Sequence, residues 1–159
     1  MSQDETKGKA GLPFYVYFDG LCEPKNPGGV ATYGIVIQQR NETIHEESGL
    51  ADAKPYSQEA SNNVAEYSAI IRALEYLDRN GLTGSEIVLR GDSKLIISQL
   101  TGEYKVKSLR IIDLHHTAKK LIQKFKNLRM EWVNRELNQE ADQLSRIAYK
   151  RYLQSQEKA

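Results

Sequence analysis

Four acidic residues stand at positions where a carboxylate is unfavourable unless it has a role; they are Asp19, Glu66, Asp92 and Asp142. With a single cysteine, Cys22, the chain cannot form a cysteine-based metal cluster. Carboxylate oxygens without His or Cys partners suit hard ions such as Mg²⁺ or Mn²⁺. Two such ions, about 3.5–4 Å apart, commonly serve in-line displacement at phosphate. The acids therefore indicate metal-assisted phosphodiester chemistry, provided that they meet in space.

Three of the four acids have an ordinary explanation when each is taken alone. Asp19 ends an apolar β-prone run, where an Asp-Gly turn accounts for it. Asp92 follows a second apolar run, and there an aspartate can cap a helix. Asp142 borders an apolar helical stripe and fits an ordinary surface acid. Taken singly, these three carry no functional conclusion.

Glu66 is harder to explain without a ligand. It lies four residues before Ile70 and eight before Leu74, which places it on the inward stripe of a long helix. A buried carboxylate without a partner costs several kcal/mol, and a cation is the simplest partner. A buried salt bridge, or an exposed first-turn glutamate favoured by the helix dipole, remains an open alternative.

The surrounding pattern predicts a mixed sheet with helices, in the order β-β-β-α-β-α-α-β-α. Three early strands with short links favour an antiparallel meander, whereas the late strands are separated by helices and should be parallel. If the strands before Asp19 and Asp92 are neighbours, their ends lie roughly 5 Å apart. Strands are expected at 14–18, 31–39, 42–50, 87–89 and 128–133, and helices from 61–63 to 80–81 and at 94–100, 109–125 and 138–153.

Length and composition fit one globular domain. The chain has 159 residues, no apolar stretch approaching the roughly 20 of a membrane span, and a polar start unlike a secretory signal. We expect a flexible lead over 1–12, one domain over 13–153 and a frayed tail over 154–159. A cytoplasmic monomer is the expectation.

Charge is unevenly distributed along the chain. Residues 1–89 carry 7 Lys/Arg against 13 Asp/Glu, and residues 90–159 carry 15 Lys/Arg against 8 Asp/Glu. The basic second half fits either the binding of a polyanion or a set of solvated helix faces.

Four motifs in sequence resemble the type 1 ribonuclease H family, especially its compact archaeal and bacterial branch. They are YFDG with NPGG and YGIVI, SNNVAEYSAII, VLRGDSKLIISQL and WVNRELNQEADQLSRIAY. The similarity covers about residues 13–150. The acids follow in the family's order, with 47, 26 and 50 residues between them.

The resemblance implies an α/β ribonuclease H-like fold whose five-stranded mixed sheet has the order 3-2-1-4-5. It implies that all four acids bind two Mg²⁺ or Mn²⁺ ions and that the enzyme cuts the RNA strand of RNA–DNA hybrids, leaving 5′-phosphate and 3′-hydroxyl ends. A wide minor groove that displays the RNA 2′-hydroxyl gives such selectivity a physical basis. The expected substrate contacts are Asn26, Gly28, Gly29, Ser61, Asn62, Asn63, Ser93, Lys94, Lys105, Lys107 and Asn138.

The chain departs from the family pattern at two places. Many members carry a histidine in the loop before the last helix, and no histidine lies there in this chain. Arg135 is the best substitute, although it also fits a surface arginine, and Asn138 is a second candidate that also fits a helix cap. Between residues 100 and 109 the chain is shorter than several relatives, which carry a basic insertion there that binds the hybrid. Lys105 and Lys107 would supply part of that binding.

Two other functions stay open at this point. One is another nuclease or polynucleotide transferase of the same superfamily, acting on double-stranded RNA or a junction. The other is a module that binds hybrid without cutting it, against which the presence of all four acids argues. Trp132, on the last expected strand, is predicted to lie in the core.

Overall fold

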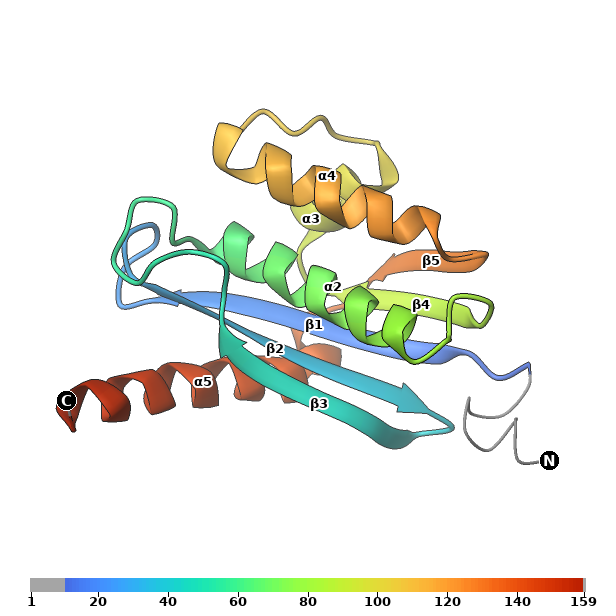
Figure 1. Ribbon diagram of the computed structural model, residues 1–159, viewed down its shortest axis with the longest axis horizontal. Coiled ribbons are helices and arrows are strands. Elements are labelled where there is room, and N and C mark those ends of the chain that lie inside the picture. The colour runs from blue at the N-terminus through green and yellow to red at the C-terminus, as the bar shows by residue number, and fades with distance from the viewer. Residues whose placement is uncertain (1–10, 159) are drawn as a thin grey trace.

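A computed structural model describes residues 11–158 and shows one five-stranded sheet in the order β3-β2-β1-β4-β5. Helices α2, α3 and α4 lie on one face of the sheet and α5 lies on the other (Figure 1). Most of the predicted flexible lead lies outside the described residues. The elements are β1 (Phe14–Glu23), β2 (Val30–Gln39), β3 (Glu42–Leu50), α2 (Asn62–Arg79), β4 (Glu86–Gly91), α3 (Lys94–Thr101), α4 (Leu109–Gln123), β5 (Asn127–Trp132), the 3-10 turn η1 (Arg135–Asn138) and α5 (Gln139–Glu157).

The strand directions confirm the predicted mixed sheet and its order. Strands β1, β2 and β3 pair antiparallel, whereas β4 pairs parallel with both β1 and β5. The β1–β4 ladder ends at the pair Tyr17–Arg90, although β1 itself continues to Glu23. Asp19 therefore lies just past this ladder, beside the point where β4 ends at Gly91.

The alternation along β1 divides its side chains between two layers. Phe14, Val16 and Phe18 belong to the main core with α2, while Tyr17 lines a cavity on the α5 side. On α2, the fully buried Ile70 and Leu74 lie at the predicted helical spacing. This core fixes α2, and with it Glu66, over β1.

Helix α5 lies against β2 because two small or polar residues allow it to approach closely. A β-carbon added at Gly34 would clash with the carbonyl oxygen of Ala141. Two residues away, Thr32 Oγ1 donates a hydrogen bond to the carbonyl oxygen of Ser145, at 2.8 Å. These contacts fix the part of α5 that carries Asp142.

Three expectations about the elements were wrong in detail. Strand β1 runs to Glu23 rather than ending at residue 18, and α5 continues to Glu157, into the segment expected to fray. Trp132 is 46 % exposed rather than in the core. The reason is that β5 is an edge strand, so its last residue borders solvent. Within residues 11–158, no helix is both long and apolar enough to cross a membrane.

Candidate active site

Three carboxylates from three separate elements meet at one edge of the sheet. Asp19 comes from β1, Glu66 from the first turns of α2, and Asp92 from the residue after β4. One oxygen of each lies within 4.8 Å of an oxygen of the others. They line a cavity of about 280 Å³. The predicted convergence of these three acids is therefore present.

A glycine allows Glu66 to reach this point. A β-carbon at Gly20 would lie 2.6 Å from both the Ala65 β-carbon and the Glu66 backbone nitrogen. Without one, α2 packs directly on β1, and the Gly20 backbone N–H donates to Glu66 Oε1 at 3.2 Å. The other oxygen, Glu66 Oε2, is buried and has no hydrogen-bond partner among the described residues.

The grouping of like charges in a buried place perturbs the acids strongly. Burial, followed by the charge of Asp92, raises the pKa of Asp19 to about 7. Burial and the neighbouring Asp19 raise the pKa of Glu66 well above its usual value. Burial also raises the pKa of Asp92, although the positive charge of Arg135 opposes this shift. Without a cation, the cluster therefore holds protons that ordinary carboxyl groups would have lost near neutral pH.

The donor set fits Mg²⁺ or Mn²⁺. All the convergent atoms are carboxylate oxygens, which hard divalent ions prefer. The unpartnered Glu66 Oε2 supplies a specific reason for a cation, because a buried oxygen without a donor is otherwise unfavourable. Residues Asp19, Glu66 and Asp92 would hold such an ion.

Asp142, the fourth predicted acid, lines the same cavity but stands apart from the other three. Its Oδ2 accepts a hydrogen bond from Arg146 Nε at 3.2 Å, one turn further along α5. Its negative charge nevertheless contributes to the raised pKa values of Asp19 and Asp92. Asp142 is thus within electrostatic reach of the cluster while its carboxylate is paired with an arginine.

The two residues considered in place of the family's histidine lie in different surroundings. Arg135 is exposed, lines the cavity and acts electrostatically on Asp92. Asn138 is only 1 % exposed, and its Nδ2 donates to the carbonyl oxygen of Phe18 at 2.8 Å. Asn138 also lies close enough to Asp92 to oppose the rise in the pKa of that carboxyl group. This burial does not support the predicted direct contact of Asn138 with nucleic acid, and indicates a residue that supports the site from within.

The predicted substrate contacts near α2 divide into rim and support. Asn62 and Asn63 line the cavity. Asn26 Oδ1 accepts from the Asn62 backbone N–H at 3.0 Å, which ties the loop after β1 to the start of α2. Ser61 caps α2 by accepting from the Val64 backbone N–H.

Gly28 and Gly29 shape the loop that carries Asn26. Gly28 has a φ of 98°, which favours glycine, and its N–H donates to the Ala60 carbonyl oxygen. A β-carbon at Gly29 would meet the carbonyl oxygens of Lys25 and Glu23. Both glycines therefore have a sufficient structural reason in the turn itself.

The remaining predicted contacts lie around α3. Ser93 lines the cavity and caps α3 by accepting from the Ile96 backbone N–H. Lys94 Nζ lies 4.6 Å from the ring centroid of Trp132. Lys105 and Lys107 are exposed in the segment between α3 and α4 and do not line the cavity.

Sequence reasoning missed three residues at this site. Arg146 and Glu23 line the cavity, and the indole Nε1 of Trp132 donates to the Asp92 carbonyl oxygen at 3.2 Å. The spacing of Asp142 and Arg146, four residues apart on a helix, was a readable signal for their pairing. The position of Trp132 at the end of a strand next to Asp92 became informative only once the sheet order was known.

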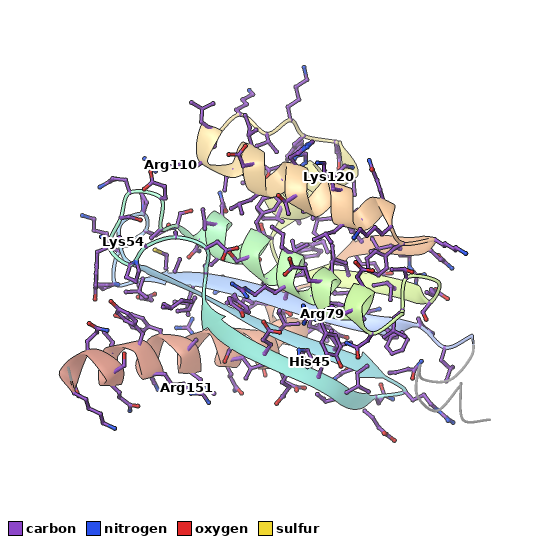
Figure 2. All side chains as sticks on the ribbon, in the orientation of Figure 1. His45, Lys54, Arg79, Arg110, Lys120 and Arg151 are labelled. Carbon is purple, nitrogen blue, oxygen red and sulfur yellow. The ribbon has the colours of Figure 1, made fainter. Side chains whose placement is uncertain are left out.

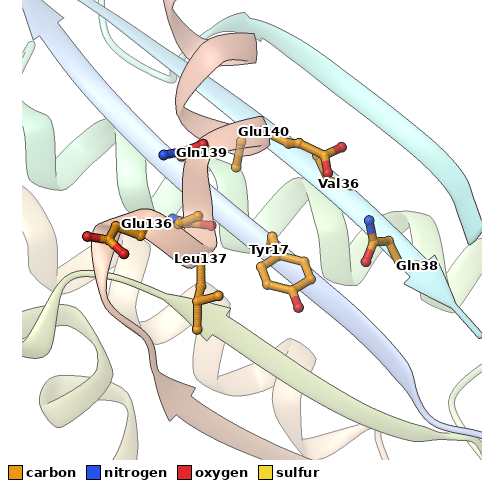
Figure 3. Close-up of a pocket in the computed structure, with 9 residues that line it drawn as sticks. Tyr17, Val36, Gln38, Glu136, Leu137, Gln139 and Glu140 are labelled. Carbon is orange, nitrogen blue, oxygen red and sulfur yellow. The ribbon is translucent and has the colours of Figure 1, made fainter. Parts of the chain in front are cut away.

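A second cavity, of about 230 Å³, lies on the α5 side of the sheet (Figure 3). Tyr17 of β1 and Leu137 of η1 face each other across it, and Gln38 of β2 borders it. Asn138 is the one residue of this lining that the sequence had singled out. The cavity brings together no further group of convergent acids among the described residues.

Comparisons with known proteins agree with this geometry. Residues 18–148 match the family model described as reverse transcriptase-like. A bifunctional protein of Mycobacterium tuberculosis is 36 % identical over 77 % of this chain, and a ribonuclease HI of Halobacterium salinarum is 34 % identical over 84 %. The chain spans 32 % of the length of the former and 63 % of the latter.

Solved structures extend the comparison to nearly whole chains. The structure of LC11-RNase H1 in complex with RNA/DNA hybrid has a TM-score of 0.78 and 33 % identity, covering 88 % of this chain and 99 % of that one. The N-terminal RNase H domain from M. tuberculosis has a TM-score of 0.78 and 29 % identity, covering 91 % and 99 %. Together with the matched fold and the three convergent carboxylates, these similarities place the chain in the type 1 ribonuclease H family.

Proposed function

We propose that this protein hydrolyses the RNA strand of RNA–DNA hybrids with the help of two divalent ions, leaving 5′-phosphate and 3′-hydroxyl ends. One observation carries the proposal: three acidic side chains, one of them with a buried unpartnered oxygen, meet within 4.8 Å in an open cavity. The similar LC11-RNase H1 was solved with an RNA/DNA hybrid, which supports this substrate class.

The residues of the cluster would act by holding cations against the substrate phosphate. Bound Mg²⁺ or Mn²⁺ would neutralise charge on the phosphate and activate a water as nucleophile. Asp19, Glu66 and Asp92 would provide the shared ligands, and Asp142 would join them for a second ion. Because the pKa values of Asp19 and Glu66 are raised, these carboxyl groups must release protons when a cation binds.

The rim of the cavity supplies the groups that would read the hybrid. Asn62 and Asn63 present amides that can donate to and accept from a 2′-hydroxyl. Arg135, permanently charged and beside Asp92, would stabilise the phosphate or the leaving oxygen in place of the family's histidine. Lys94, Lys105 and the other basic contacts would bind the phosphate backbone without sequence preference.

A panel of labelled duplexes tests the proposal. We expect cleavage of the RNA strand of an RNA–DNA hybrid with Mn²⁺ or Mg²⁺, none in EDTA, and none of a DNA duplex. Asp92→Asn should abolish cleavage, whereas Asp113→Asn, which alters an exposed aspartate of α4, should not. An Asp92→Asn enzyme that cuts hybrid at the wild-type rate would refute the assignment of this residue.

The same panel separates the alternative functions. Cleavage of double-stranded RNA at a comparable rate would identify a broader duplex nuclease. Tight hybrid binding without turnover in either metal would identify a binding module. A monomer acting in the cytoplasm stays a prediction, which light scattering of the purified protein and the location of a tagged chain would test.

A further inference from the structure

Arg146 occupies an unusual place for a helix-surface arginine. It lines the same cavity as the acids, and its Nε is 3.2 Å from Oδ2 of Asp142. Its side chain is 57 % exposed, whereas that of Asp142 is 28 % exposed. The guanidinium therefore contacts Asp142 beside the cavity and keeps access to solvent.

The pairing explains why Asp142 is separate from the other acids. Asp19, Glu66 and Asp92 lie within 4.8 Å of one another, and Asp142 does not belong to this group. Burial and then the charge of Asp92 raise the pKa of Asp19 to about 7, and the charge of Asp142 adds a smaller contribution even at its present distance. Arg146 offers this carboxylate an opposite charge one helical turn away, which stabilises Asp142 outside the cluster.

A cation that recruits Asp142 must compete with this arginine. The pair is partly exposed and spaced i,i+4 on a helix, and such pairs are weak. A divalent ion among several carboxylates outcompetes a weak ion pair of this kind. Once released, the Arg146 side chain lines the cavity with five N–H donors, which suit a phosphate.

We infer that Arg146 is a positioning residue that alternates between two anions: it holds Asp142 before the second divalent ion binds, and a backbone phosphate of the hybrid afterwards. This inference rests on the proposed function, since it requires both the ion and the nucleic acid. It assigns to Arg146 two effects of opposite sign. The arginine weakens binding of the second ion and strengthens binding of the substrate.

Two measurements on Arg146→Gln test the inference. In calorimetric titration with Mn²⁺ and no nucleic acid, the weaker site should bind about two- to fivefold more tightly than in the wild type. In hybrid cleavage at saturating Mn²⁺, KM should rise while kcat stays close to wild type. The slope of log KM against log salt should fall by about one charge, because one phosphate contact is lost.

Two further variants separate the contact from simple charge. Arg146→Lys keeps the charge but not the planar fork, so its metal affinity and KM should lie between those of the wild type and Arg146→Gln. Arg151→Gln removes a positive charge from the same helix, on which Figure 2 labels Arg151. Arg151 lines a different cavity, together with Tyr152. That control should leave both measurements unchanged.

The outcomes are distinct from those of the proposed function. Unchanged Mn²⁺ affinity in Arg146→Gln, unchanged KM, or a weakening of both would overturn the inference while hybrid cleavage by the wild type persisted. A wild type that neither binds Mn²⁺ nor cuts hybrid would instead overturn the proposed function, and the inference with it.

Discussion

Replacing Asp19 with asparagine should stabilise the metal-free protein at neutral pH. In the folded chain burial, then the charge of Asp92, raises the pKa of Asp19 from 3.8 to about 7. A carboxyl group with a raised folded-state pKa contributes its full stability below the unfolded-state value, and that contribution is lost as pH rises through the folded-state value. The unfolding free energy of the wild type in EDTA should therefore fall between about pH 4 and pH 7. The contribution of residue 19 to this fall is absent in Asp19→Asn, which has no carboxyl group there.

The size of the effect follows from the same numbers. A pKa that moves from 3.8 to about 7 corresponds to about 4 kcal/mol of unfolding free energy. This is an upper limit, because water in the open cavity screens part of the repulsion. We expect the unfolding free energy of Asp19→Asn to exceed that of the wild type by between about 1 and 4 kcal/mol at pH 7.5. That difference corresponds to roughly 2–16 °C in Tm for a chain of this size.

Thermal unfolding of both proteins in EDTA, from pH 4 to pH 8, measures the difference directly. It should be near zero at pH 4, grow through pH 5–7 and then stay level. Asp113→Asn, an exposed aspartate on α4, serves as the matched control and should show no such growth. A difference between Asp19→Asn and the wild type that is the same at every pH, or that shrinks as pH rises, would refute the account of the buried acid cluster. Added Mn²⁺ should raise the Tm of the wild type and have little effect on Asp19→Asn.

Three further changes test how the surroundings support the site. Gly34→Ala should lower the unfolding free energy by about 1–3 kcal/mol and reduce activity, because the new β-carbon would push α5 away from β2. Calorimetry and hybrid cleavage measure the two effects, and an unfolding free energy equal to that of the wild type would contradict the prediction. Asn138→Ala should cost about 1–3 kcal/mol, because the buried carbonyl oxygen of Phe18 loses its donor, and a change below 0.5 kcal/mol in urea unfolding would count against it. Trp132→Phe removes the indole donor to the Asp92 carbonyl oxygen but keeps an aromatic ring at a half-exposed position. It should therefore reduce kcat with little change in Tm. A kcat equal to that of the wild type would show that this hydrogen bond does not position Asp92.

The architecture was predictable because its signals are local and periodic. The apolar stripe of α2, with Ile70 and Leu74, requires one buried helical face, and the alternation from Phe14 to Phe18 requires a strand between two layers. Helices before and after β4 make β4 and β5 parallel. The strand order itself came from the family resemblance, because no local pattern fixes which strands are neighbours.

The candidate site was predictable only in part, for a different reason. The inward position of Glu66 follows from helical spacing, and that of Asp92 follows from the rule that ligands gather at the carboxyl ends of strands, whereas Asp19 lies inside β1, just past its ladder with β4. The i,i+4 spacing of Asp142 and Arg146 indicates their pairing, but the separation of Asp142 from the other three acids depends on where α5 lies in the fold, which the sequence pattern does not give. The exposure of Trp132 depends on β5 being an edge strand, which is a property of the whole sheet.

The hydrogen bond from Asn138 to Phe18 joins residues 120 positions apart in the chain. It links the strand that is first in sequence to the segment just before the last helix, and Asp142 follows within a turn. Contacts between residues so far apart in the chain form slowly, because closing a long loop costs chain entropy before the new contacts stabilise the closed state. The wall of the cavity formed by η1 and α5 is thus completed only when this segment docks, so that a partly synthesised chain ending before η1 lacks both Asp142 and the support that Asn138 gives to β1.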